Sequence, residues 1–248
     1  MKIYTRITVA IALILVVSLA SAELIVIGDV DAPNTASRPQ NYDLLENVRN
    51  GGTDILWLTG GYAVNSRYTD LRSRWTTAGA TITDDVTTDV GTTLTGRDLV
   101  VVSQLWCNDS LFDAGAISAI SSYAGGGGEV LYIAQVCSEQ QLNSYNAFLT
   151  AIGSSMQFLP DSGDTSGDEV IDTSTPYGAG VTAFDLGGWT ALSGGTPVVT
   201  LNDEVGVAFG DAVAAIVEPV PTLSFWAITA LIVLLGMIVF GQRKRFLT

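Results

Sequence analysis

The two cysteines, Cys107 and Cys137, carry the only thiols of the 248-residue chain. Each lies a few residues beyond an apolar run that is expected to form a β-strand, so neighbouring parallel strands would bring both to one edge of a sheet. In an oxidising compartment this pair predicts a disulfide, which would close a loop of about 30 residues and contribute roughly 3 to 4 kcal/mol. Two free thiols and a catalytic Cys137 are the alternatives. A reactive thiolate needs a nearby cation or base, and no basic residue occurs from Asp98 to Gln242.

Histidine is absent from the chain. Its absence excludes Ser-His-Asp and Cys-His catalysis, metal sites built on imidazole and histidine proton shuttles. Carboxylates are abundant instead, because 25 Asp and Glu oppose 11 Lys and Arg to give a formal net charge of −14. Proteins that bind nucleic acid do so through basic patches, so this balance argues against nucleic acid as a partner.

Five acidic residues crowd a loop that also contains glycine and serine, where carboxylates repel one another unless a cation or solvent intervenes. Calcium takes carboxylate and carbonyl oxygens, although the spacing does not match an EF-hand. Three interpretations stay open: a solvated loop, a calcium site, and a pair of glycosidase carboxylates that needs no histidine. No cofactor other than calcium is expected. The five residues are Asp172 and the candidate calcium ligands Asp161, Asp164, Asp168 and Glu169.

Apolar runs alternate with helix-like segments over residues 50–160, as in an α/β domain with a mainly parallel sheet. Strands are expected at Leu24–Val30, Ile55–Thr59, Thr81–Thr83, Asp98–Gln104 and Glu129–Gln135. Helices are expected through Tyr68, Leu71 and Trp75, over Phe112–Tyr123, and from a Ser138/Gln141 capping box to a C-terminal cap at Gly153.

After residue 158 the composition changes to Gly, Ser, Thr and Asp. Val198–Leu201 and Val205–Phe209 are expected to form a hairpin. We interpret this region as a β-rich extension that closes the same domain.

The carboxyl ends of the strands are where open α/β sheets bind ligands. Amide and aromatic side chains gather there, and they suit sugars or other neutral polar ligands. Alternatively, the aromatic residues pack and the amides hydrogen-bond the loop backbone. The crevice residues are Gly60, Gly61, Tyr62, Gln104, Trp106, Asn108, Gln135, Glu139 and Gln140.

Residues 1–22 have the three parts of a secretory signal peptide. Lys2 and Arg6 form the positive region, an apolar run follows, and Ala20-Ser21-Ala22 is an A-x-A cleavage site. The apolar run has about 13 residues, fewer than the roughly 20 that span a membrane. The mature chain is therefore expected to begin at Glu23.

Leu223–Phe240 is an 18-residue stretch without a charge, and it predicts a transmembrane helix. The basic residues Arg243, Lys244 and Arg245 follow it, and such clusters stay on the cytoplasmic side. Residues 23–218 would then face outward. That part of the chain contains all 25 carboxylates, six arginines and no lysine, which gives it a net charge of −19.

The start of this helix resembles a known sorting signal. Within residues 220–226, the sequence matches the Pro-Thr-Leu-Ser-x-Trp motif of the IPTL-CTERM signal of Gram-negative bacteria, with Val in place of Ile before it and Phe225 where an acidic residue is usual. The resemblance implies recognition by a processing enzyme of the exosortase or rhombosortase kind, and a polysaccharide partner; a plain single-span anchor is the alternative. The motif residues are Val220, Pro221, Thr222, Leu223, Ser224 and Trp226.

The order of elements over residues 50–160 resembles the class I glutamine amidotransferase-like, or flavodoxin-like, fold. The resemblance implies an α/β domain with a doubly wound, mainly parallel sheet, carried here by "GRDLVVVSQ", "YAGGGGEVLYIA" and "NAFLTAIGSS". In that family the nucleophile elbow follows the strand that Glu129–Gln135 matches. Here the segment from Ala134 to Ser138 lacks the flanking glycines, and the catalytic histidine is absent. The resemblance therefore implies a noncatalytic relative.

Together these features predict a signal peptide at 1–22, an extracytoplasmic domain at 23–218, and a sorting motif, helix and basic tail at 219–248. The protein is expected to be exported and to face the periplasm from the inner membrane, or to reach the cell surface after sorting. Its domain would serve binding or structure in the envelope. A carboxylate-based hydrolase of envelope polymers and a calcium-dependent adhesion module are the alternatives.

Overall fold

The computed structural model describes residues 23–104, 112–162 and 169–212, which form an α/β unit around one sheet of ten strands. The predicted α/β class is confirmed, and the sheet combines parallel and antiparallel strands. The predicted signal peptide, sorting motif, transmembrane helix and basic tail lie outside the described residues. Among the helices of the described ranges, none is both long and apolar enough to cross a membrane.

The strand order is β3-β2-β4-β5-β1-β10-β8-β6, with β9 paired to β10 and β7 paired to β9. The helices are α2 (Tyr42–Arg49), α3 (Thr69–Thr77), α4 (Ala114–Gly125) and α5 (Glu139–Ala151), with 3-10 turns at η1 (Pro39–Asn41) and η2 (Ser66–Tyr68). The strands are β1 (Glu23–Ile27), β2 (Asp54–Leu58), β3 (Thr81–Asp85), β4 (Leu99–Ser103), β5 (Glu129–Ile133), β6 (Gln157–Ser162), β7 (Glu169–Ile171), β8 (Thr190–Ser193), β9 (Thr196–Leu201) and β10 (Glu204–Asp211).

The parallel half of the sheet contains β3, β2, β4, β5 and β1. Every residue of β4 is buried, as expected of a strand covered on both faces. The four strands predicted within residues 50–160 are confirmed, with ends that differ by one or two residues. The predicted helix at Phe112–Tyr123 begins two residues later, where the Asp113 side chain accepts a hydrogen bond from the Ala116 N–H.

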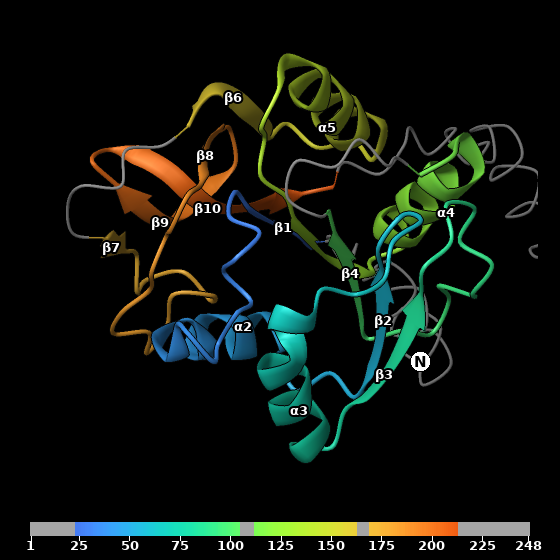
Figure 1. Cartoon of the computed structure of the whole chain (residues 1–248), viewed down its shortest axis with the longest axis horizontal. Coiled ribbons are helices and arrows are strands. Elements are labelled where there is room, and N and C mark those ends of the chain that lie inside the picture. Colours follow the sequence, from blue (N-terminus) through green and yellow to red (C-terminus); the bar gives the residue numbers. More distant parts are fainter. Residues whose placement is uncertain (1–22, 105–111, 163–168, 213–248) are drawn as a thin grey trace, which may run out of the picture. The chain divides into compact units, whose positions relative to one another are not determined.

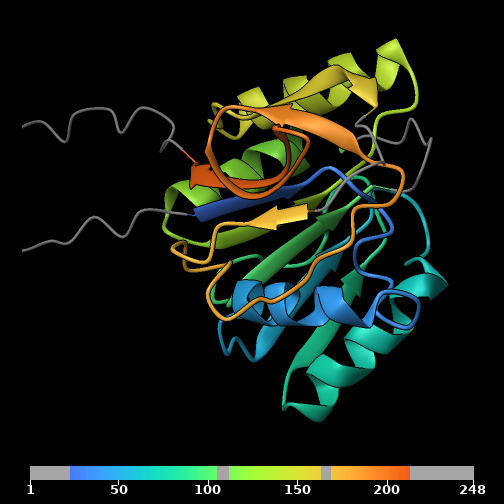
Figure 2. The ribbon, with the colours of Figure 1, turned by 90° about the vertical axis from the view of Figure 1, so that its left-hand side faces the viewer.

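Strand β1 has a larger role than its sequence indicated. It lies in the middle of the sheet, parallel to β5 on one side and antiparallel to β10 on the other (Figure 2). Its last four side chains are fully buried. The amidotransferase-like pattern covers residues 50–160, and β1 precedes that range, so the core includes a strand that the pattern leaves out.

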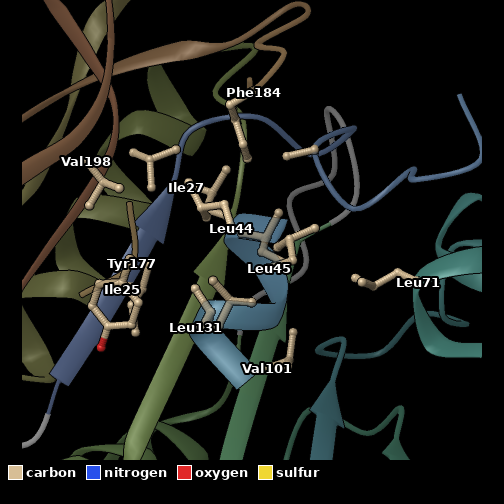
Figure 3. Packing of buried hydrophobic residues seen from close by; sticks show 14 of the residues in the cluster. Ile25, Ile27, Leu44, Leu45, Leu71, Val101, Leu131, Tyr177, Phe184 and Val198 are labelled. Carbon is tan, nitrogen blue, oxygen red and sulfur yellow. The ribbon is translucent and has the colours of Figure 1, made fainter. Parts of the chain in front are cut away.

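Helices cover both faces of the sheet (Figure 1). One buried cluster joins α2 and α3 to alternate residues of the strands, and Figure 3 shows Leu44 and Leu45 of α2 packed near Ile27 and Leu131. The other cluster joins α4 and α5 to the intervening residues, such as Val26 and Tyr132 in the opposite face. The two clusters therefore lie on opposite faces of the sheet, each covered by two helices.

The predicted limits of α5 are also confirmed. The Ser138 hydroxyl accepts a hydrogen bond from the Gln141 N–H at 3.3 Å, while the Gln141 side chain accepts one from the Cys137 N–H, one residue before the expected partner. At the other end Gly153 has a φ of 83° and donates to Thr150, and the next N–H reaches back to Leu149. These two bonds form a Schellman cap.

The β-rich extension continues the same sheet. Strands β9 and β10 form the predicted hairpin, in which Leu201 pairs with Glu204 across a two-residue turn. Both turn residues, Asn202 and Asp203, have positive φ, as type I′ hairpin turns require. Since β10 pairs with β1, the hairpin attaches the extension directly to the central strand.

Candidate functional site

The parallel strands end together at one edge of the sheet, where the sequence predicted a ligand crevice. The direction of winding reverses between β2 and β4, because α3 leads from β2 outward to β3 while α4 leads from β4 toward β5 on the opposite face. In doubly wound sheets the ligand site lies at such a switch point. The residues that follow β2 and β4 are therefore the candidate functional site.

The loop after β2 is shaped by two glycines. Gly60 and Gly61 have φ values of 61° and 103°, which favour glycine over residues with a side chain. A Cβ on Gly60 would lie 3.4 Å from the ring of Phe112. Leu58 pairs with Val102, so Gly60 and Gln104 each follow a paired position on neighbouring strands by two residues.

Gln104 is the best-defined polar group at the switch point. The residue is 2% exposed, and its N–H donates to the Ile133 carbonyl at 2.9 Å. Its side-chain carbonyl oxygen is buried, and among the described residues it has no hydrogen-bond partner. An unsatisfied buried acceptor costs about 1 to 3 kcal/mol, so a ligand that donates a hydrogen bond here would recover that cost.

The remaining crevice residues are spread along the same edge. Tyr62 is 36% exposed, and its carbonyl accepts a hydrogen bond from the Thr59 hydroxyl. Gln135 follows β5 and is partly buried, whereas Glu139 and Gln140 are exposed in the first turn of α5. Trp106 and Asn108 lie outside the described residues. The structure therefore places Gly60 and Gln104 just after the neighbouring strands β2 and β4, and the other described crevice residues along the flanking segments.

A buried ion pair at the end of β1 was missed from the sequence. Asp29 is fully buried, and Arg38 Nη1 lies 2.5 Å from its Oδ2. The Asp29 carboxylate also accepts from the N–H groups of Asp31 and Gly187, at 2.8 and 2.9 Å. Burial raises the pKa of Asp29, against the lowering effects of the Arg38 charge and these hydrogen bonds. The donors to the Asp29 carboxylate all belong to the protein itself. Through them the ion pair connects the loop after β1 to the segment before β8.

The close packing around this ion pair explains why residue 187 is a glycine. A Cβ on Gly187 would lie 1.8 Å from Arg38 Nη2, so a side chain there would displace the guanidinium. The sequence offered one local signal, a Gly-Asp pair directly after an apolar run, but nothing in it identified Arg38 and Gly187 as the partners.

The opposite, amino edge of the sheet holds a pair of carboxyl groups that was also missed. The Tyr177 hydroxyl contacts both Glu23, the first residue of β1, and Glu129, the first residue of β5, the latter at 3.2 Å. Burial raises the pKa of Glu129 to about 7, and the negative charge of Glu23 adds to this increase, while the Tyr177 hydrogen bond opposes it. Burial and the same two carboxylates raise the pKa of Tyr177.

The acidic loop is described only in part. Asp164, Asp168 and the side chain of Asp161 lie outside the described residues. The Glu169 carboxylate accepts a hydrogen bond from the Leu186 N–H at 3.2 Å, and Asp172 accepts from both the N–H and the hydroxyl of Ser174. Within the described ranges no group of three acidic or cysteine side chains is placed to hold a metal ion. The calcium site stays a prediction.

Cys137 is exposed between β5 and α5, and its sulfur is disulfide-bonded. It is therefore neither a free thiol nor a nucleophile in this state. Cys107, the chain's other cysteine, lies outside the described residues.

The chain was also compared with known proteins, and no family model, curated protein or solved structure matches it. Two edges of the sheet therefore carry the candidate functional groups. One carries a buried amide acceptor at a switch point, and the other carries a close pair of carboxyl groups.

Proposed function

We propose that the protein is an exported bacterial envelope protein, anchored in the membrane or sorted to the cell surface, whose noncatalytic α/β domain binds a neutral polar ligand such as a glycan. The observation that carries the binding role is the unsatisfied carbonyl of Gln104 at the switch point. A sugar hydroxyl is a neutral donor that suits this acceptor. The net charge of −19 over residues 23–218 disfavours anionic ligands.

The strand order supports a flavodoxin-like or amidotransferase-like domain. Flavodoxin-like sheets have the order 2-1-3-4-5, and β3-β2-β4-β5 follows it when β2 is taken as the first strand. The fifth position is filled by β1, which comes from the beginning of the chain. The catalytic residues of the amidotransferases have no equivalents, because the chain lacks histidine and Cys137 is disulfide-bonded.

Replacing Gln104 by leucine tests the binding role. We expect the affinity for the exopolysaccharide of the producing cells to fall roughly 2- to 12-fold, the equivalent of one neutral hydrogen bond of about 0.5 to 1.5 kcal/mol. Stability should hold or rise in the same variant, since the substitution removes an unsatisfied buried acceptor. Isothermal titration and thermal unfolding measure the two effects.

The matched control is Gln157→Leu on β6, which should bind the polysaccharide like the wild type. Equal affinity of the wild type and Gln104→Leu, or no affinity of the wild type for any of a panel of neutral polysaccharides, would show that the binding role is wrong.

The intact mass of the protein from its own envelope tests export and sorting. We expect a chain that begins at Glu23, as the A-x-A site predicts. A mass that ends near Pro221 indicates sorting and transfer, and a mass that runs to Thr248 indicates a single-span anchor. A mass that includes residues 1–22 contradicts export through a cleaved signal.

One observation favours the hydrolase as a second candidate. Glu129 has a pKa of about 7, which suits a general acid, and it lies near a second carboxyl group, that of Glu23, as in the carboxylate pairs of glycosidases. However, the Tyr177 hydroxyl contacts both groups, and they lie at the edge opposite the switch point. Polymer turnover by the wild type that is lost in Glu129→Gln, with binding retained, would favour the hydrolase.

A further inference from the structure

Every cationic side chain of the described domain is paired with a carboxylate. Residues 23–218 contain six arginines and neither lysine nor histidine. Each arginine forms an ion pair, and none of these pairs includes Glu23 or Glu129. The pairs are Arg38 with Asp29, Arg49 with Glu46, Arg67 with Asp31, Arg72 with Asp84, Arg74 with Asp70 and Arg97 with Asp54.

Glu23 and Glu129 are held close together by the sheet. Leu24 pairs with Val130, so Glu23 and Glu129 precede paired residues on parallel strands about 4.8 Å apart. Both side chains contact the Tyr177 hydroxyl, which Figure 3 shows pointing toward the beginning of β1. Because β5 and β10 hold β1 on both sides, the position of Glu23 is fixed.

The hydrogen bonding of this group needs one more donor. A phenol has a single proton, and the nearer contact of Tyr177 uses it for Glu23. When both carboxyl groups are ionised, the 3.2 Å contact between Tyr177 and Glu129 joins two acceptors. A proton on Glu129, or a donor from outside the set of arginines such as a cation or water, resolves this contact.

We propose that removal of residues 1–22 supplies this cation: the α-ammonium group freed at Glu23 pairs with Glu129 at the amino edge of the sheet. This inference rests on the part of the proposed function that makes residues 1–22 a cleaved signal. The cleavage hydrolyses the peptide bond between Ala22 and Glu23, and the new amine takes up a proton. Processing would thus complete the charge balance of the central strands.

The other charged groups nearby favour a cation there. Asp211 of β10 is the strand partner of Glu23 on the side away from β5, and it has an interaction of its own. Arg49, Asp98 and Glu129 line one cavity of about 300 Å³, where Arg49 is already paired with Glu46. Tyr123 of α4 is affected by the charge of Glu129, which raises its pKa further above the increase that burial causes. Negative charge therefore predominates around the beginning of β1.

The absence of lysine makes this inference directly testable. After cleavage, the α-amine of Glu23 is the only primary amine before Lys244. An amine-acylating reagent applied to the full-length chain in detergent then reports on it, and mass spectrometry of the amino-terminal peptide separates it from Lys244. We expect the pKa of the Glu23 α-amine to lie above its ordinary range of about 7.7 to 8.0. Because only the neutral amine reacts, acylation at pH 7 should be roughly tenfold slower in the wild type than in Glu129→Gln.

The control is Asp43→Asn, an exposed carboxylate on α2, which should acylate like the wild type. Equal acylation rates of the wild type and Glu129→Gln would overturn the ion pair while leaving export and binding untouched. An amino-terminal peptide that begins at Met1 would instead overturn the cleavage on which the pair depends.

A second measurement compares the cleaved chain with a chain in which Ala22→Leu blocks the A-x-A site. In the blocked chain Glu129 has a folded pKa of about 7, above its ordinary 4.5, so the folded state binds more protons between these values. Its melting temperature should therefore fall as the pH rises from 5 to 8. The ammonium group lowers the pKa of Glu129, so the melting temperature of the cleaved chain should fall less over the same pH range. Identical pH profiles would overturn the proposal.

Discussion

Replacing Arg38 by methionine is expected to lower the free energy of unfolding by about 3 to 5 kcal/mol at pH 7. The reason is that Asp29, its partner, is fully buried, while Arg38 is 16% exposed in its side chain. Without the guanidinium, the carboxylate keeps its hydrogen bonds from Asp31 and Gly187 but loses its only cation. Denaturant unfolding of the two proteins measures the difference.

The pH dependence identifies the cause. Burial already raises the pKa of Asp29 above 3.8, and loss of the Arg38 charge should raise it further. Since a raised carboxyl pKa costs stability above that pKa, the loss in Arg38→Met should shrink as the pH falls toward 4. The double variant with Asp29→Asn should be less destabilised at pH 7 than Arg38→Met alone.

The matched control is Arg67→Met. Its ion pair with Asp31 has a similar length of 2.6 Å, but the Arg67 side chain is 55% exposed, so a loss of at most about 1 kcal/mol is expected. If Arg38→Met and Arg67→Met lower the free energy of unfolding equally, burial of Asp29 is not the reason that the Arg38–Asp29 pair stabilises the domain.

Local sequence signals predicted the elements well where the cause of the structure is itself local. The Ser138 cap, the Gly153 cap and the hairpin before Glu204 each depend on residues within a few positions of one another. Continuous apolar runs also sufficed for β2, β4 and β5, because strands buried on both faces need apolar residues at every position.

Contacts between distant residues could not be predicted in this way. The central place of β1 depends on its pairing with β10, whose partner residues lie 180 to 188 positions later in the chain. The environment of Asp29 likewise depends on Gly187, which no spacing connects to it. An apolar run reports that a strand is buried, but it does not report which strands lie beside it.

The candidate site shows the same division. Strand ends placed Gly60 and Gln104 at one edge, and the structure has them directly after the neighbouring strands β2 and β4. That the Gln104 carbonyl is unsatisfied follows from burial and from the positions of its neighbours, which the sequence does not contain. The raised pKa of Glu129 is also a product of packing, because the largest cause is its loss of solvent.

Loss of the disulfide at Cys137 is expected to be the second large effect. Cys107 is the only other cysteine, and a bond between the two closes a loop of about 30 residues, which contributes roughly 3 to 4 kcal/mol by restricting the unfolded chain. Cys137→Ser should lose this amount in denaturant unfolding, and the exposure of Cys137 should let a reductant produce the same loss in the wild type.

The control compares the two single cysteine substitutions with the double substitution. Cys107→Ser, Cys137→Ser and the double variant should be equally destabilised, because each removes the same bond, and a reductant should not change any of them further. Additive losses would mean that the two side chains stabilise the domain separately, and wild-type unfolding that is insensitive to a reductant would contradict the prediction. Since Cys107 follows Gln104 by three residues in the sequence and Cys137 directly precedes the N-cap of α5, Gln104→Leu should be compared with the wild type only while the disulfide is intact.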